Sequence, residues 1–123
     1  MSFSLIFKSD IDANDLKKMT PNCTILFFAV IDYCQKRSLP FMITSLISDR
    51  VNINAKSSTH EEGRAFDISI NGWDINDIDD CAFHFNTYYR NIAAISASDG
   101  VARAAVTKTH GTGPHIHFQV RRQ

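Results

Sequence analysis

The stretch PHIHFQV, residues 114–120, alternates strictly between apolar and polar side chains. Successive side chains of a β-strand point to opposite faces, so this stretch predicts a strand with one apolar and one polar face. The polar face carries His115, His117 and Gln119. The apolar face belongs in a core, whereas two histidines two residues apart can both reach one small ion or one substrate. An H-x-H pair by itself more often lies on a solvent-facing strand, where its histidines have no catalytic or metal-binding role.

A second informative stretch lies upstream, in residues 58–67 with the sequence STHEEGRAFD. It leads from a polar loop into a strand that we expect over residues 65–70. Gly63 permits a tight turn between the loop and the strand. Because Phe66 belongs to the apolar face of this strand, Asp67 points to the opposite face.

The two strands together predict a metal site. If they lie side by side, His60, Asp67 and His117 converge. Two imidazoles and one carboxylate suit zinc and leave a fourth position for water, as in catalytic rather than structural zinc sites. Zinc lowers the pKa of bound water toward about 7 and polarises a carbonyl.

Two helices are expected. Thr20 and Pro21 form a good helix start, with Thr as N-cap and Pro at the first position, and the helix should end near Arg37. Its residues 25–31 are apolar on nearly every side, which predicts a central buried helix. Asp74 can cap the second helix, and one apolar stripe on it is formed by Ile75, Ile78, Ala82, Phe85, Tyr89 and Ile92.

The remaining pattern is that of strands and turns. Further strands are expected at residues 3–7, 41–47, 101–107 and 115–121, a loop or single helical turn at 10–18, a loop at 52–59, and turns at 71–72 and 99–100. With helices first and hairpin-like strands later, the sequence predicts an α+β fold. We expect one domain over residues 1–123, with a mainly antiparallel sheet flanked by two helices and the zinc site on the sheet.

Composition excludes several classes of protein. The chain has 123 residues, of which 44% are apolar and 21% charged, enough for one core. Thirteen basic residues balance thirteen acidic ones, which argues against nucleic-acid or anionic-membrane binding. The apolar run at 25–31 is too short to span a bilayer. Membrane insertion is therefore not expected.

The three cysteines, Cys23, Cys34 and Cys81, form no C-x-x-C pair. We interpret them as reduced thiols, in keeping with synthesis in the cytoplasm. The first eight residues lack the basic region of a signal peptide. An action outside the cytoplasm would need another route of export.

The upstream stretch resembles a known family. Ser58, His60, Gly63, Ala65 and Asp67 match, position by position, the S-x-H-x-x-G-x-A-x-D signature of the D-Ala-D-Ala metallopeptidases. That family includes D,D-carboxypeptidases, D,D-dipeptidases and phage L-alanyl-D-glutamate endolysins.

The tail is more similar to a second family. Residues 111–118, GTGPHIHF, resemble the T-G-P-H-x-H-F stretch that is typical of lysostaphin-type peptidases. Both families share one fold and one zinc geometry with the zinc domain of hedgehog proteins. The resemblance covers roughly residues 28–120.

The resemblance implies a role for each matching residue. It makes His60, Asp67 and His117 the ligands of one zinc ion. It makes His115 a catalytic residue beside the metal, which helps to activate water or to stabilise the tetrahedral intermediate. Ser58 is placed on the substrate side, where it fixes the loop around His60 and is not a nucleophile.

The chain departs from the family at the general base. Many D-Ala-D-Ala peptidases carry Glu or Asp shortly before the last ligand, but Pro114 and Gly111 stand at the corresponding positions here. Lysostaphin-type enzymes use histidines instead. His115, with His110 or His84, would then take this role, although His84 is better explained as a structural histidine of the second helix.

A second departure concerns the substrate. The family often has S-G-Y-R before the first ligand, and its Arg holds a substrate carboxylate. This chain reads SLIS at residues 45–48, and Arg50 follows two places late. Arg50 is expected to replace the family Arg, or else this anchoring is lost.

No role in the site is expected for several other side chains. We expect solvated positions for Glu61, Glu62, Arg121 and Arg122. Trp73 is expected to pack in the core, with contact to a substrate at the cleft rim as the alternative.

The expected function is that of a zinc-dependent peptidase that hydrolyses peptidoglycan stem or cross-link peptides, as a D,D-carboxypeptidase or an endolysin-type endopeptidase. Its small size resembles that of phage or prophage lysis proteins. Such a protein is made in the cytoplasm and reaches the cell wall or periplasm through a release partner.

Two alternatives stay open. The first is a non-catalytic zinc-binding interaction domain of the same fold, as in hedgehog proteins, which the two departures favour. The second is a histidine-triad nucleotidyl transferase, which H-x-H-x-Q resembles but which leaves residues 58–67 unexplained. Cobalt or manganese can also occupy an open His-His-Asp site, and zinc is favoured by ligand type and availability.

Overall fold

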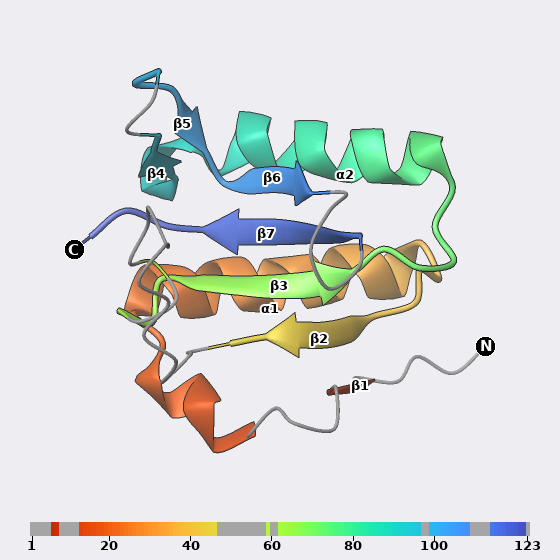
Figure 1. The fold of residues 1–123 in the computed structure, drawn as a ribbon, viewed down its shortest axis with the longest axis horizontal. Helices are drawn as coiled ribbons and strands as arrows, with labels where there is room; N and C mark the ends of the chain where they lie inside the picture. Colours follow the sequence, from red (N-terminus) through yellow and green to blue (C-terminus); the bar gives the residue numbers. More distant parts are fainter. Residues whose placement is uncertain are drawn as a thin grey trace.

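The computed structural model describes residues 6–7, 13–46, 59, 62–96, 99–108 and 114–122. Over these residues the chain is α+β, as the sequence predicts (Figure 1). The helices are α1 (Pro21–Lys36), α2 (Ile75–Tyr88) and the 3₁₀ helices η1 (Ala13–Lys18) and η2 (Arg90–Ile92). The strands are β1 (Ile6–Phe7), β2 (Met42–Ser45), β3 (Ala65–Ser69), β4 (Ala94–Ile95), β5 (Ala102–Arg103), β6 (Ala105–Lys108) and β7 (His115–Gln119).

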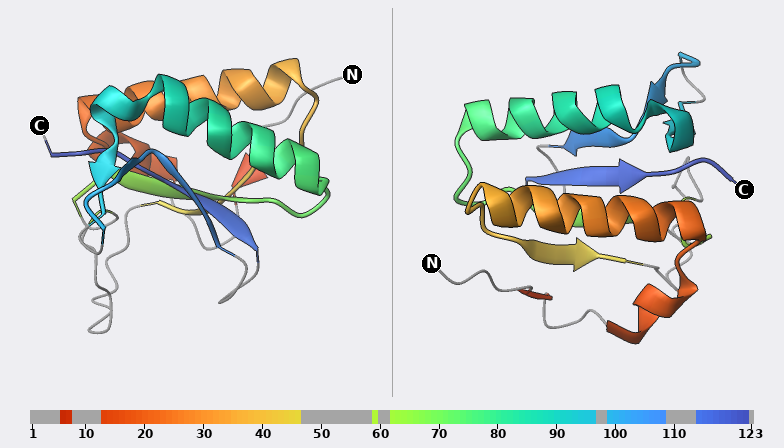
Figure 2. Two further views of the ribbon diagram at one scale, coloured as in Figure 1. Left: turned by 90° about the horizontal axis from the view of Figure 1, so that it is seen from above. Right: turned by 180° about the vertical axis from the view of Figure 1, so that it is seen from behind.

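One mainly antiparallel sheet forms the centre of the molecule. Its strand order is β1-β2-β3-β7-β6, and only the β1–β2 pair is parallel among the strands described. Both α helices lie on the same face of this sheet (Figure 2). The two strands from which the fold was predicted, β3 and β7, are neighbours at the middle of the sheet.

Helix α1 begins where the sequence predicts. The side chain of Thr20 accepts a hydrogen bond of 3.3 Å from the amide of Cys23, and Pro21 is the first helical residue. The prediction of a helix buried on all sides is wrong: Ile25 and Phe28 are 56% and 63% exposed. Because α1 covers one face of the sheet, only one of its sides contacts the core.

Helix α2 also begins at its predicted cap. Asp74 accepts a hydrogen bond of 2.9 Å from the amide of Asp77. The apolar stripe is confirmed at Phe85, which is buried, but not at Ile75, which is 65% exposed. The first turn of α2 extends past the end of β6 (Figure 1).

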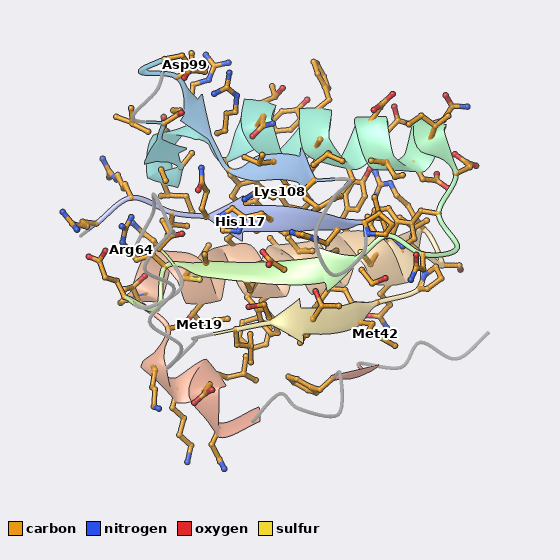
Figure 3. All side chains as sticks on the ribbon, in the orientation of Figure 1. Met19, Met42, Arg64, Asp99, Lys108 and His117 are labelled. Atoms are coloured by element: carbon orange, nitrogen blue, oxygen red, sulfur yellow. The ribbon has the colours of Figure 1, made fainter. Side chains whose placement is uncertain are left out.

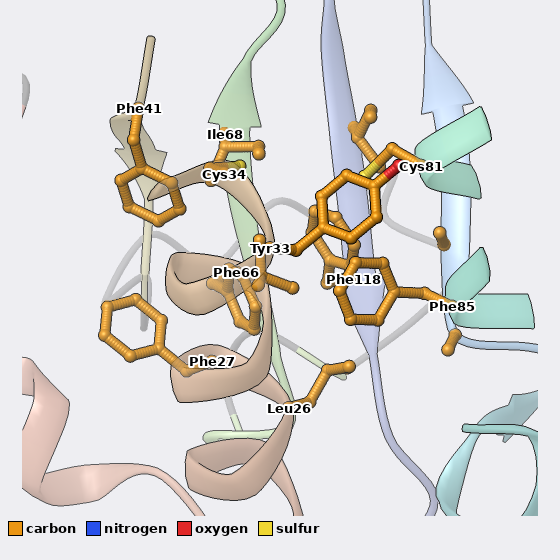
Figure 4. Packing of buried hydrophobic residues seen from close by; sticks show 14 of the residues in the cluster. Leu26, Phe27, Tyr33, Cys34, Phe41, Phe66, Ile68, Cys81, Phe85 and Phe118 are labelled. Carbon is orange, nitrogen blue, oxygen red and sulfur yellow. The ribbon is translucent and has the colours of Figure 1, made fainter. Parts of the chain in front are cut away.

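The core lies between the helices and the sheet. Phe66 and Phe118 face each other across β3 and β7 with stacked rings 5.1 Å apart, and Phe27 and Phe85 contact this pair edge-on (Figure 4). A fully buried side chain of this size contributes about 1.5–3 kcal/mol to folding. Cys23, Cys34 and Cys81 are buried free thiols, and burial raises the pKa of Cys23 and Cys34 to about 12.

The predicted strand over residues 101–107 is divided in two. A bend at Ala104 separates β5, which pairs with β4, from β6, which pairs with β7. The side chain of Asn86 on α2 bonds both the amide and the carbonyl of Ala105, at 2.9 and 3.0 Å. These bonds tie the start of β6 to the helix layer, while β5 turns away into a hairpin that the sequence pattern did not predict.

None of the helices within the described residues is both long enough and apolar enough to cross a membrane.

Candidate metal centre

The face of the sheet opposite the helices carries the candidate site (Figures 2 and 3). Asp67 on β3 stands directly across from His117 on β7, and Ser69 stands across from His115. The alternation of the sequence explains this placement, because Phe66, Ile68, Ile116 and Phe118 occupy the buried face of the same strands. Two of the three predicted ligands therefore lie side by side.

The carboxylate of Asp67 lies between two imidazole rings. Nδ1 of His117 is 2.8 Å from Oδ1 of Asp67, and Nε2 of His115 is 3.7 Å from Oδ2 of the same residue. The side chains of His117, Asp67 and His115 are 8%, 14% and 16% exposed. Charges so shielded from water interact more strongly than charges on an open surface.

The donor atoms suit zinc in chemistry and nearly in distance. Imidazole nitrogen and carboxylate oxygen are both zinc ligands, and bonds of about 2.0–2.2 Å place two donors of a tetrahedral site about 3.3–3.6 Å apart. Nδ1 of His117 and Oδ1 of Asp67 are 2.8 Å apart. The two atoms would have to move apart by about 0.5–0.8 Å to bind the same ion.

The third predicted ligand, His60, lies outside the described residues, as do Arg50, Ser58 and His110. Within the part of the chain that the structure describes, no group of three or more His, Cys, Asp or Glu side chains is arranged to hold a metal. The predicted set of ligands includes His60, which lies outside this part of the chain.

Gly63 shows why the motif has glycine at this position. Its φ is +71°, and a Cβ there would lie 2.2 Å from the carbonyl oxygen of Lys18. The carbonyl of Gly63 accepts a hydrogen bond of 3.0 Å from the amide of Thr20, the N-cap of α1. The turn before β3 is thus packed against the start of the first helix, and no other residue type fits.

Arg64 is a buried side chain that the sequence analysis missed. Its Nη1 donates to the carbonyl of Val120 at 2.8 Å, and its Nη2 contacts Glu62 at 2.9 Å (Figure 3). Arg122 also bonds Glu62, at 2.6 and 3.1 Å. The predicted solvated position of Arg122 is confirmed, since its side chain is 72% exposed, whereas Glu62 is only 32% exposed and lies between two arginines. A charged residue just before an alternating strand, inside the motif, is the signal that could have indicated Arg64.

Gln119, which is not among the predicted ligands, also contacts His117. Oε1 of Gln119 is 3.1 Å from Nε2 of His117, and Nε2 of Gln119 donates to the carbonyl of Arg103 at 3.0 Å. The signal was present in the sequence, since Gln119 shares the polar face of the strand with both histidines.

Two other candidates belong to the helix layer and the core. His84 packs among Tyr33, Phe85 and Tyr88, with ring centroids 4.8–5.0 Å apart. Burial, together with the charge of Arg37, lowers its pKa. Its structural role is confirmed. Trp73 is buried and donates to the carbonyl of Pro40 at 2.9 Å, which confirms packing rather than a position at a rim.

Comparison with protein-family models, with curated proteins and with solved structures found no match for this chain.

Proposed function

We propose that this protein is a zinc-dependent peptidase that hydrolyses peptide bonds of peptidoglycan. The observation that carries the proposal is the contact of 2.8 Å between Asp67 and His117, with His115 3.7 Å from the same carboxylate. These residues stand at the positions of the family motifs that supply two zinc ligands and the catalytic histidine. They share the sheet face that the helices leave uncovered (Figure 2).

The proposed zinc site is formed by His60, Asp67 and His117. When bound at such a site, zinc makes a water more acidic and polarises a carbonyl. Asp67 supplies the negative charge that favours a cation there, and its partial burial strengthens that attraction.

His115 is the proposed acid–base residue. It precedes His117 by two residues on the same face of β7. The resemblance to the family motifs implies that it lies beside the metal and is not a ligand. Histidine is the side chain that most often transfers protons in catalysis. Nε2 of His115 is therefore suited to take a proton from the attacking water and to return it to the leaving amine.

The substrate and the place of action follow from the same resemblance. We propose stem or cross-link peptides of peptidoglycan as the substrate and the cell wall or periplasm as the place of action, reached through a release partner. Arg50 is the proposed anchor for a substrate carboxylate, with Ser58 supporting the loop around His60.

The test is a digestion of purified peptidoglycan with mass spectrometry of the released fragments. Wild type, wild type with a chelator, and His115→Ala are compared. Fragments that disappear with the chelator and with the substitution support a peptidase, and their masses identify the bond. A wild-type protein that releases no fragments contradicts the proposal.

A second candidate is a non-catalytic zinc-binding interaction domain. It is favoured by the exposed Pro114, which stands where many D-Ala-D-Ala peptidases carry a carboxylate base. Release of peptidoglycan fragments by the zinc-loaded protein discriminates between the two. One bound zinc per chain without released fragments supports the binding domain, whereas fragment release that depends on His115 excludes it.

A further inference from the structure

The side of the His117 ring that faces away from Asp67 also has a polar contact. Gln119 follows two residues later on the same face of β7, and its Oε1 lies 3.1 Å from Nε2 of His117. Its Nε2 donates to the backbone carbonyl of Arg103 at 3.0 Å. The side-chain amide thus bridges the candidate ligand and β5.

The orientation of this amide is determined by the group on its other side. A backbone carbonyl can only accept a hydrogen bond, so the NH₂ group of Gln119 must face Arg103 and the oxygen must face His117. The reversed amide would bring two oxygen atoms together. Since an amide oxygen can only accept, Nε2 of His117 must carry a hydrogen.

The consequence concerns the other nitrogen of the ring. The carboxylate oxygen of Asp67 can also only accept, so its contact of 2.8 Å with Nδ1 is made through a hydrogen on Nδ1. A metal ion bound to Nδ1 would replace that hydrogen, and the neutral ring would then keep its one hydrogen on Nε2. A hydrogen bond on the opposite nitrogen commonly fixes this state of a metal-binding histidine.

We infer that Gln119 is a positioning residue for the proposed zinc site. It orients the His117 ring and keeps the hydrogen on Nε2, which leaves Nδ1 for the metal. The inference rests on the proposed function only in taking His117 as a zinc ligand.

The bridge is anchored at both ends. The amide of Gln119 donates to the carbonyl of Ala104 at 3.0 Å, so the backbone of this residue is tied to the segment that its side chain contacts. Arg103 pairs with Ala94 in the β4–β5 hairpin, and its side chain bonds Asp99 at 2.8 and 3.1 Å. The carbonyl that orients Gln119 therefore belongs to a segment with its own supports.

The experiment measures zinc affinity by competition with a chelating dye and the Tm of the metal-free protein. Gln119→Leu removes the acceptor for Nε2 and should lower zinc affinity by about 10–100-fold. Gln119→Glu keeps an oxygen toward His117 but places the other toward the Arg103 carbonyl, so it should lower the Tm and retain most of the affinity.

Asn86→Leu is the matched control. Asn86 also bonds the backbone of a neighbouring strand through its side-chain amide, at Ala105, but does not contact His117. It should lower the Tm with little effect on zinc. If Gln119 served stability alone, Gln119→Glu would lose zinc affinity as much as Gln119→Leu does. That result overturns the inference.

The ¹⁵N spectrum of the His117 ring supplies an independent readout. The zinc-loaded wild type should show a hydrogen on Nε2 and none on Nδ1. A hydrogen on Nδ1, or an unchanged zinc affinity of Gln119→Leu, contradicts the inference alone. Zinc binding without peptidoglycan cleavage contradicts the proposed function and leaves the inference standing, whereas a wild type that binds no zinc contradicts both.

Discussion

The two faces of the β3–β7 pair carry opposite kinds of side chain. One face carries Phe66, Ile68, Ile116 and Phe118, which are fully buried beneath the helices. The other carries Asp67, Ser69, His115, His117 and Gln119, whose polar atoms bond one another or nearby backbone. The same five ladder positions of β3 and β7 therefore build the core and the candidate site. Substitutions on one face should change stability, and those on the other should change metal binding.

The largest effect on stability is expected on the core face. Phe118→Ala removes a ring that stacks on Phe66 and meets Phe85 edge-on. The loss should lower the free energy of unfolding by about 3–5 kcal/mol, because transfer and cavity costs add. Urea denaturation measures it. A cost below that of an exposed substitution such as Phe28→Ala would contradict the assignment of this face as the core.

A smaller loss is expected at the turn that leads into β3. Gly63→Ala combines a positive φ with a Cβ 2.2 Å from the Lys18 carbonyl. Its strain should cost about 1–3 kcal/mol or more of unfolding free energy. Gly100→Ala is the matched control, since Gly100 has the same φ of +71° and no atom within 4 Å of the added Cβ. If both substitutions lowered the free energy of unfolding equally, the close approach to Lys18 would not contribute to the loss.

On the polar face, the expected change is in metal binding rather than in stability. Asp67→Asn removes the carboxylate charge but keeps an oxygen beside His117. Zinc binding, followed by calorimetry, should be lost, while the metal-free protein changes by about 1 kcal/mol or less. An unaltered zinc affinity would remove Asp67 from the site.

The smallest effect is expected in the β4–β5 hairpin, away from both faces. Hydrogen bonds from Arg103 and from the amide of Val101 lower the pKa of Asp99 to about 2. A lowered folded-state pKa stabilises the protein above the ordinary carboxyl pKa of 3.8, and this contribution is lost as the pH falls toward about 2. Asp99→Asn should therefore flatten the fall in Tm between pH 4 and pH 2, since the variant has no carboxyl to protonate. Identical pH profiles would contradict the pairing of Asp99 with Arg103.

Features that depend on nearby residues could be predicted from the sequence, whereas features that depend on distant contacts could not. Thr20 and Asp74 start helices as predicted, because a cap bonds an amide three residues away. The exposure of Ile25 and Phe28 was missed, since an apolar surface does not reveal how many of its sides a fold will cover. The bend at Ala104 was also missed, because it depends on Asn86 in a different element.

By itself, the sequence determined the helix starts, the turn at Gly63, the two alternating strands and the face on which each of their side chains lies. These features depend on residues a few positions apart and on the period of a strand. Only the tertiary structure decided that Asp67 meets His117, fifty residues later, and that Gln119 holds the same ring through a carbonyl of β5. Such contacts depend on strand order and register, which arise when the whole core packs at once.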